Sequence, residues 1–222
     1  MSRRYALRPG ETDNMMVTMQ QYIIASTGDG GERDAGLQPW SSVAASSPLH
    51  SVQRLAAASR FAGAGAALAA DFHTLAKAVA GALEVKAVAV NLVLSARVWI
   101  VGSYGLPSRL AKAGSLPTAW APCTRVVLQN GTVVFEDLRD AYRGQANPVV
   151  SEHGMRFYIG VPLRFRSDVI GTLCVLDDRP AALSAEAVTV LAAIGDEVMR
   201  ALLEQEPHGE GAIDVLGATP PH

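Results

Sequence analysis

The sequence is poor in cysteine: Cys123 and Cys174 are the two copies in 222 residues. They lie far apart along the chain, and neither belongs to a Cys-x-x-Cys motif or to a cysteine-histidine cluster with metal-ligand spacing. This distribution speaks against a structural zinc site and against a disulfide framework. Both cysteines are therefore expected to be free thiols.

The sequence also lacks an excess of either charge. It has 19 Lys and Arg against 21 Asp and Glu, which gives a net charge of -2. Such a balance provides no field that would steer a polyanion toward the protein. Neither nucleic acid nor an anionic membrane is therefore expected as a partner.

Long hydrophobic runs are absent as well. The first residues, MSRRYALRPGETDN, contain no apolar run of the length of a signal peptide. The Ala- and Gly-rich stretch from Ala62 to Ala70 is too short and too weakly hydrophobic to cross a bilayer. The protein is therefore expected in the cytoplasm.

Catalytic and cofactor motifs are missing too. The sequence has no Ser/His/Asp pattern, no phosphate-binding loop and no cluster of residues spaced to bind a metal. It also has no recognisable kinase, cyclase, phosphodiesterase or DNA-binding segment. These absences predict that the protein is not an enzyme. The alternative is a thiol-based oxidoreductase that uses Cys123.

The most informative stretch that is present consists of two apolar segments, Phe157 to Leu163 and Val169 to Leu176, joined by a short polar link. This pattern predicts two adjacent antiparallel strands at the centre of a sheet. In the first strand, Phe157 and its alternate residues face one core, and Tyr158 faces the other side. In the second strand, alternation predicts one face made of Val169, Leu173 and Val175 and an opposite face made of Ile170, Cys174 and Leu176. Both sides of this sheet need to be covered.

Further helices and strands are predicted around this pair. They are a helix from Pro48 that breaks near Gly63 and Gly65, a helix from Asp71 to Leu83 with Asp71 as its N-cap, a hairpin of Lys86 to Leu94 and Arg97 to Tyr104, a short helix within 117–131 that ends at Asn130, a strand from Thr132 to Leu138, a polar loop from Arg139 to Gly154 with room for one helical turn, and a helix from Ser184 to Leu203. The apolar stripe of the last helix is wide enough to serve both the sheet and a partner helix.

Three regions follow from composition. Residues 1–47 are predicted to be a flexible extension, with room for a short docking helix from Asn14 to Ala25. Residues 48–204 are predicted to form one domain, and residues 205–222 are predicted to be a disordered tail because they are rich in Gly and Pro.

The order of these elements resembles the GAF domain family over about Ser51 to Leu203. The most specific portion is RFYIGVPLRFRSDVIGTLCVLDDRPAALSAEAV, which is similar to the family pattern of Arg-Phe-Tyr, small-x-Pro-Leu, Gly-Thr-Leu-Cys-Val-x-Asp and a helix that opens in Ser/Thr-x-Glu. Further matches are GLP at Gly105 to Pro107, the segment around Cys123, and VFEDLRDAYRGQANPVV.

The resemblance implies an α+β fold with a GAF/PAS-like antiparallel sheet. Terminal helices would cover one face, where members often form a homodimer, and a short helix and a loop would roof a ligand pocket on the other face. Members bind cyclic nucleotides, haem, bilins or small metabolites, or relay signals, so the ligand and any cofactor stay open, haem and bilin included.

The expected function is a sensory or regulatory module whose output comes from a partner signalling protein. The alternative is a ligand-free scaffold for protein–protein interaction. One enzymatic GAF-like class reduces free methionine sulfoxide with several cysteines around its pocket. Two distant cysteines fit that pattern poorly.

Nine residues are candidates for the ligand site: Trp120, Cys123, Arg125, Asp137, Arg139, Tyr142, His153, Phe157 and Tyr158. Cys123 is either a redox-sensitive or chromophore-attaching thiol or, the favoured reading, a small buried hydrophobe. His153 is weighed for haem or proton chemistry against a solvated loop position, which is favoured. The mouth of the pocket is expected to be lined by Asp137, Arg139, Tyr142, Phe157 and Tyr158, which offer a carboxylate, a guanidinium and aromatic walls to a small planar or anionic ligand. Loop anchoring and core packing are the equal alternative for these five residues. Cys174 is expected to be structural.

Overall fold

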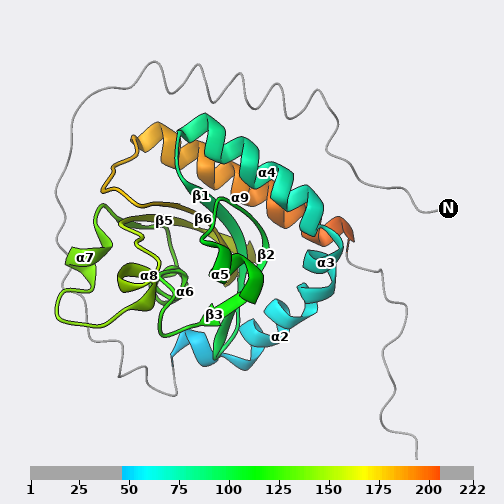
Figure 1. Cartoon of the computed structure of the whole chain (residues 1–222). Coiled ribbons are helices and arrows are strands. Elements are labelled where there is room, and N and C mark those ends of the chain that lie inside the picture. Colours follow the sequence, from blue (N-terminus) through cyan, green and yellow to red (C-terminus); the bar gives the residue numbers. More distant parts are fainter. Residues whose placement is uncertain (1–46, 206–222) are drawn as a thin grey trace, which may run out of the picture.

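A central sheet organises the chain, whose computed structural model describes residues 47–205 (Figure 1). The predicted extension over 1–47, with its short helix, and the predicted tail over 205–222 lie outside the described residues, apart from Ser47 and Gln205. No helix in the described range is long and apolar enough to cross a membrane.

Six strands form one sheet in the spatial order β3-β2-β1-β6-β5-β4, and all neighbouring pairs are antiparallel. The strands are β1 (Ala87–Val93), β2 (Arg97–Tyr104), β3 (Ser115–Pro117), β4 (Val133–Phe135), β5 (Phe157–Phe165) and β6 (Asp168–Asp177). The predicted central pair, β5 and β6, is confirmed, and β6 also pairs with β1. The predicted α+β fold class is therefore correct.

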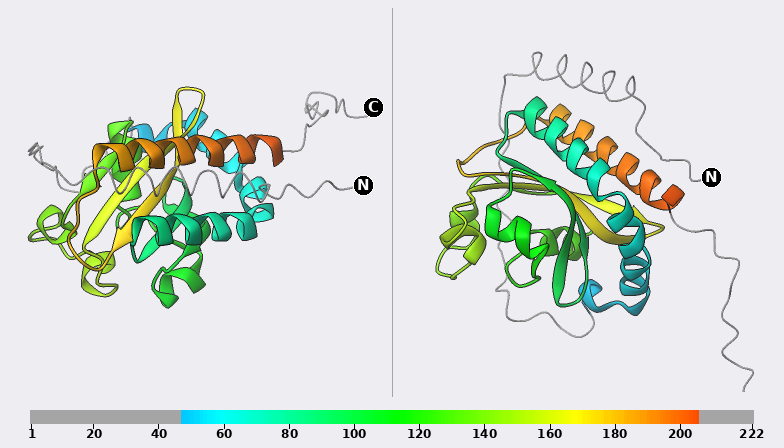
Figure 2. Two further views of the ribbon diagram at one scale, coloured as in Figure 1. Left: turned by 90° about the horizontal axis from the view of Figure 1, so that it is seen from above. Right: turned by 45° about the vertical axis from the view of Figure 1, so that its right-hand side comes forward.

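Helices cover both faces of the sheet. They are η1 (Pro48–His50), α2 (Val52–Arg60), α3 (Ala62–Ala67), α4 (Ala69–Leu83), α5 (Ser108–Ala113), α6 (Cys123–Gln129), α7 (Leu138–Ala141), α8 (Pro148–Ser151) and α9 (Ala185–Gln205). The two long helices lie across one face, α4 over β1 and β2, and α9 over β5 and β6 (Figures 1 and 2). The short helices α5 to α8 lie on the opposite side. These four helices, with the loops beside them, are called the roof below.

The sheet separates two hydrophobic cores. Val88 of β1 and Leu173 of β6 pack toward α4 and α9, in what we call the helix-side core. Their neighbours Ala89 and Cys174 pack under the roof, in the roof-side core. Successive residues enter different cores because strand side chains alternate between faces. Each fully buried aliphatic side chain contributes about 1.5–3 kcal/mol.

A β-bulge at Ile170 interrupts this alternation. The pairing register between β5 and β6 shifts there, so Ile170 is an extra residue with no partner on β5. Strict alternation had placed Val169 with Leu173 and Val175. In the structure Ile170 packs with Leu173 and Val175, whereas Val169 packs with Cys174. The prediction was wrong for these two residues because a bulge reverses the facing of the positions beyond it.

The predicted helix break near Gly63 and Gly65 is also wrong, because both glycines lie inside α3. The helical path is interrupted instead at Phe61 and at Leu68, which flank α3. A Cβ on Gly65 would lie 2.8 Å from Cγ1 of Val101, so this glycine serves close packing of the helix on the sheet.

Other boundaries differ locally. Asp71 lies in the first turn of α4 rather than at its N-cap, which is Leu68. The predicted strand over 132–138 is shorter because Asp137 begins α7 as its N-cap. The segment 105–117, for which no element was predicted, contains α5 and β3, and the predicted loop from Arg139 to Gly154 contains most of α7 and all of α8. The predicted stop of α6 at Asn130 is confirmed by its left-handed φ of 51°.

Candidate functional site

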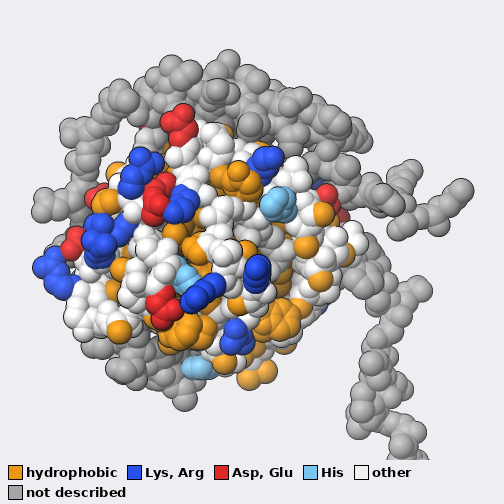
Figure 3. Space-filling model, viewed as in Figure 1, with side chains coloured by type: hydrophobic (Ala, Val, Ile, Leu, Met, Phe, Trp, Pro, Cys, Tyr) orange, Lys and Arg blue, Asp and Glu red, His pale blue; other side chains and the backbone are white. Residues whose placement is uncertain are grey.

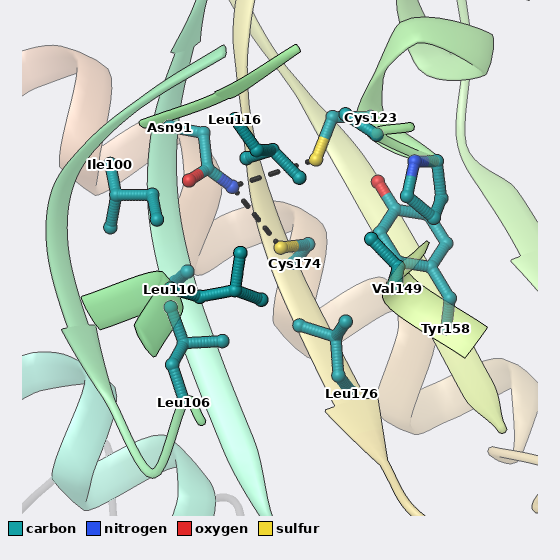
Figure 4. A pocket seen from close by; sticks show the side chains of 13 residues that line it. Asn91, Ile100, Leu106, Leu110, Leu116, Cys123, Val149, Tyr158, Cys174 and Leu176 are labelled. Atoms are coloured by element: carbon teal, nitrogen blue, oxygen red, sulfur yellow. Dashed lines mark hydrogen bonds between the residues drawn. The ribbon is translucent and has the colours of Figure 1, made fainter. Parts of the chain in front are cut away.

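A small cavity of about 40 Å³ lies between the sheet and the roof (Figure 4). Its lining residues are Ala89, Asn91, Ile100, Leu106, Leu110, Leu116, Ala121, Pro122, Cys123, Val149, Tyr158, Cys174 and Leu176. None of them is charged, and the polar groups among them converge at one end. The cavity is therefore apolar with a single polar corner.

The polar corner is assembled from four elements. Asn91 comes from β1, Tyr158 from β5, Cys174 from β6 and Cys123 from the first position of α6. Local interactions hold the entry to α6 in place, because the buried hydroxyl of Thr124 donates to the Thr118 carbonyl oxygen at 2.7 Å. The corner thus joins the sheet directly to the roof.

Asn91 occupies the centre of this corner. Its amide nitrogen donates to the Cys174 sulfur at 3.2 Å, to the Thr172 hydroxyl at 3.3 Å and to the Cys123 sulfur at 3.6 Å. Figure 4 shows both sulfurs directed at this nitrogen. The amide oxygen Oδ1 has no hydrogen-bond partner within the described residues. Asn91 therefore presents a buried, unused acceptor.

The two thiols differ in acidity. A hydrogen bond from the Cys174 thiol stabilises the Cys123 thiolate, and it lowers the pKa of Cys123 to about 7 against the opposing effect of burial. The same interaction raises the pKa of Cys174 well above its usual value, and burial raises it further. Of the two, Cys123 is the one that ionises first, so it is the stronger nucleophile near neutral pH.

Tyr158 completes the corner. Its ring lies over Gly160, where an added Cβ would be 2.7 Å from Cζ of Tyr158 and 2.9 Å from Cγ2 of Val126. The hydroxyl lies close enough to Cys123 to help lower the pKa of that thiol, but it forms no hydrogen bond of normal geometry. Burial raises the pKa of Tyr158 itself, so the phenol stays neutral.

Two of the nine predicted site residues, Cys123 and Tyr158, line the cavity. Tyr142 lies outside the lining, in the roof-side core, with its ring centroid 6.5 Å from that of Phe135. Burial raises the pKa of Tyr142, and the positive charge of the half-buried Arg125 partly opposes this effect. Phe157 faces the opposite way, into the helix-side core, because it precedes Tyr158 on the same strand.

Three further predicted residues lie on the outside of the roof. Trp120 has 40% of its surface exposed, Arg139 is exposed, and His153 is half-buried in the turn after α8. On the face seen in Figure 3, acidic and basic side chains are interspersed among hydrophobic ones. The structure therefore does not gather these three residues around the cavity.

Asp137 anchors the roof rather than lining the cavity. Its carboxylate accepts from Nε of Arg156 at 2.8 Å, from a second guanidinium nitrogen of Arg156, and from the backbone N–H of Arg139 at 3.0 Å. The bonds from Arg156 are the main reason why the pKa of Asp137 falls to about 2. This ion pair fixes the start of α7 to the start of β5.

Two residues of the polar corner, Asn91 and Cys174, were not among the predicted site residues, and neither was Thr172, which accepts from the Asn91 amide. Asn91 did leave a signal, since it is the one polar side chain in the apolar run AVAVNLV. Its burial to 3% exposure required a partner or a function. Cys174 was expected to be structural, and its contact with the cluster around Cys123 depends on the order of the strands. Among the described residues, no group of three or more His, Cys, Asp and Glu could hold a metal.

Many solved structures share this architecture, among them the following three. The GAF domain from an Acinetobacter phosphoenolpyruvate-protein phosphotransferase is 19% identical, with a TM-score of 0.51, and the match covers 69% of this chain and 95% of that one. The type II free methionine-R-sulfoxide reductase from Thermoplasma acidophilum is 16% identical, with a TM-score of 0.52. This match covers 64% of this chain and 97% of the reductase. The red/green cyanobacteriochrome NpR6012g4, in its red-light-absorbing state, is 17% identical, with a TM-score of 0.51. This match covers 62% of this chain and 94% of the cyanobacteriochrome chain.

At these identities the likeness concerns the fold alone. No match is found among curated proteins. Residues 68–202 match the family model of the GAF domain, and this range spans α4 to α9 with the whole sheet. Because the match covers more than half of the sequence, the chain belongs to the GAF domain family.

Proposed function

We propose that this GAF domain is a sensory or regulatory module that binds a small neutral molecule in the cavity under the roof. The observation that carries the proposal is the buried Asn91 side chain, whose amide nitrogen is fully engaged while its oxygen has no partner in the described chain. The ligand would donate a hydrogen bond to this oxygen.

The energetics favour such a ligand. A buried polar atom without a partner costs about 1–3 kcal/mol, so a ligand that donates to Asn91 recovers this free energy on binding. The Tyr158 hydroxyl, which forms no hydrogen bond of normal geometry among the described residues, provides a second polar contact at the same end of the cavity. The surrounding aliphatic side chains would bury the apolar remainder of the ligand.

Size and charge narrow the ligand class. Apart from the Cys123 thiolate, the lining has no charged side chain to balance an ionised ligand, and burying an unpaired charge is costly. A volume of about 40 Å³ accommodates a few non-hydrogen atoms. Haem, bilins and cyclic nucleotides would require the roof to move outward. Small amides and alcohols therefore fit best.

The sheet offers a route from the cavity to the terminal helices. Cys174 lines the cavity, and its neighbours Leu173 and Val175 pack on the other face, in the core that also contains Leu191 of α9. A ligand that shifts Cys174 therefore displaces side chains under α9. We place the dimer interface on α4 and α9, where Leu203 is 42% exposed, and the output in a partner signalling protein.

The proposal also includes a cellular location and a dimeric state. We place the protein in the cytoplasm, because both cysteines are free thiols and reducing compartments keep thiols in that state. Sedimentation of the full chain at micromolar concentration tests the dimer. A monomer that persists as the concentration rises would contradict the role assigned to α4 and α9.

A second candidate function is reduction of free methionine sulfoxide. The observation in its favour is that Cys123 and Cys174 share one cavity despite their separation in the sequence. Against it, the cavity is small and has no charged residue to bind the ammonium and carboxylate groups of a free amino acid. Turnover of methionine sulfoxide with dithiothreitol as the reductant would establish this activity, and no turnover is expected.

Thermal denaturation with a panel of small amides and alcohols tests the first candidate. Compounds that raise the Tm of the wild type should leave the Tm of Asn91→Leu unchanged. Thr172→Val is the matched control: Thr172 accepts from the same amide but does not line the cavity, so ligand stabilisation should persist in that variant. Equal shifts in all three proteins, or no shift in the wild type, would contradict the proposal.

A further inference from the structure

We propose that Cys123 and Cys174 form a peroxide-reactive dithiol, which small hydroperoxides oxidise to a disulfide between α6 and β6. This inference goes beyond ligand binding, because it assigns a covalent modification to the cavity. It rests on the placement of the two sulfurs, on their different environments and on the dimensions of the space around them.

The two sulfurs share one hydrogen-bond donor. Both sulfurs lie within 3.6 Å of one nitrogen, Nδ2 of Asn91, and the two thiols interact with each other. They belong to different elements, since Cys123 begins α6 and Cys174 lies in the middle of β6. Figure 4 shows both side chains directed into the same cavity. This shared position beside one donor is the geometric basis for a disulfide between the two cysteines.

The environments assign different roles to the two thiols. The Cys123 sulfur has Cys174, Thr172 and Tyr158 as nearby donors that stabilise its thiolate, which makes it the attacking group. Cys174 remains protonated, because burial and the neighbouring Cys123 both oppose its ionisation. It can release its proton when it resolves the oxidised Cys123. A nucleophilic and a resolving thiol are the two parts that such a reaction requires.

The dimensions of the cavity select the oxidant. Cys123 is 5% exposed and Cys174 is 2% exposed, so a protein thiol or a bulky reagent cannot reach them directly. A water molecule needs about 10–15 Å³ of space measured in this way. Hydrogen peroxide has two heavy atoms, so it fits within a cavity of about 40 Å³.

The reaction proceeds in two steps. In the first, the Cys123 thiolate attacks one peroxide oxygen, an S–O bond forms, the O–O bond breaks, and the leaving hydroxide takes up a proton to become water. In the second, the Cys174 sulfur attacks the Cys123 sulfur, an S–S bond forms, and the S–O bond breaks. The departing oxygen leaves as water with the Cys174 proton. Two thiols supply the two electrons that reduce the peroxide.

The disulfide would link the roof to the central strand. Its expected consequence is a roof that can no longer separate from β6, since α6 is then covalently held at its first residue. A ligand that needs the roof to move would be excluded from the oxidised form. Reduction by a small thiol would restore access.

The test is the intact mass of the full chain before and after exposure to a small excess of hydrogen peroxide. The wild type should lose the mass of two hydrogen atoms and both free thiols. Proteolysis should yield one peptide pair that joins Cys123 to Cys174, and dithiothreitol added to the unfolded protein should reverse the change. Retention of both thiols, or a disulfide that joins two chains, would overturn the proposal.

Two variants assign the roles. Cys174→Ser should stop after the first step and yield a sulfenic acid on Cys123, which dimedone traps once the protein is unfolded in urea. Cys123→Ser should leave Cys174 unmodified. A sulfenic acid on Cys174 in that variant would overturn the assignment. If either variant fails to fold, the peptide map of the wild type still decides the proposal.

The bulky cumene hydroperoxide provides the control for access. It should oxidise the pair many-fold more slowly than hydrogen peroxide does, and equal rates would contradict entry through the cavity. Failure of this inference is distinct from failure of the ligand proposal. Peroxide inertness with intact binding of neutral probes overturns the dithiol alone, whereas oxidation without any probe binding overturns the ligand site alone.

Discussion

Nδ2 of Asn91 lies 3.2 Å from the sulfur of Cys174, a hydrogen bond that is fully buried between two central strands. The same nitrogen reaches the sulfur of Cys123 on the roof. One amide thus links three elements at the polar end of the cavity.

Replacement of Asn91 by leucine should slow peroxide-driven disulfide formation several-fold, because the two sulfurs lose their common donor. Stability should change by about 1 kcal/mol or less, since leucine has the same branched shape, its larger methyl groups lie beside the cavity, and the change removes the unpartnered oxygen together with the donor. Timed thiol titration gives the rate, and urea unfolding gives the stability. An unchanged rate of disulfide formation would show that Asn91 does not position the thiols.

The acidity of Cys123 predicts a pH dependence. With a pKa of about 7, the thiol of the folded protein should be modified by iodoacetamide at a rate that rises through neutral pH. An unfolded cysteine ionises near pH 8.5, so between these values the unfolded state binds more protons and stability should rise with pH. In Cys174→Ala the alkylation midpoint should move upward, because the thiol that chiefly stabilises the thiolate is gone. A midpoint near 8.5 in the wild type would contradict this reading.

Substitutions that enlarge a side chain test whether the cavity offers usable space. Ala89 lines it, whereas Ala87 lies two residues earlier on the same face of β1, is fully buried and does not line it. Ala89→Val should be neutral or stabilising by up to about 1.5 kcal/mol, because its two added carbons occupy existing space. Ala87→Val should destabilise by about 1–3 kcal/mol through overpacking. Chemical denaturation compares the two, and equal losses would argue against usable space at Ala89.

The ion pair between Asp137 and Arg156 should stabilise the folded protein at neutral pH. Asp137→Asn is expected to cost about 1–2 kcal/mol at pH 7, because the depressed pKa of the carboxylate reports a favourable ion pair. The folded pKa of about 2 lies below the unfolded value, so this stabilisation is present above about pH 4 and is lost as the pH falls through 2. Unfolding of both proteins between pH 7 and 2 should therefore show converging stabilities. A constant difference would contradict the role of the charge.

Local patterns in the sequence were sufficient to predict the scaffold. The strands β5 and β6 follow from short apolar runs with a polar link, and the stop of α6 follows from Asn130, which tolerates a left-handed backbone. The bulge at Ile170 could not be predicted, because it depends on the register between two strands. Local information therefore identifies elements more readily than it identifies the faces that their side chains occupy.

The site was less accessible to sequence reasoning. Cys123 and Tyr158 were identified as candidates, but the contact of Asn91 with Cys174 results from pairing between β1 and β6, which the order of elements along the chain does not reveal. Phe157 was included with Tyr158, although adjacent strand residues face opposite cores. Asp137 has a charge that suits a ligand, yet Arg156 engages it. Polar residues near a predicted pocket can serve as anchors instead.

The central claim is that the functional centre of this domain is the cavity around Asn91, Cys123 and Cys174. The most direct test is methyl NMR of alanine-labelled protein during titration with small amides and alcohols. Ala89 and Ala121 line the cavity, while Ala58 and Ala76 are equally buried in the helix-side core. The account predicts saturable shifts at Ala89 and Ala121 with much smaller changes at Ala58 and Ala76. Shifts that are confined to the helix-side core, or no saturable shift at any of these methyl groups, would contradict it.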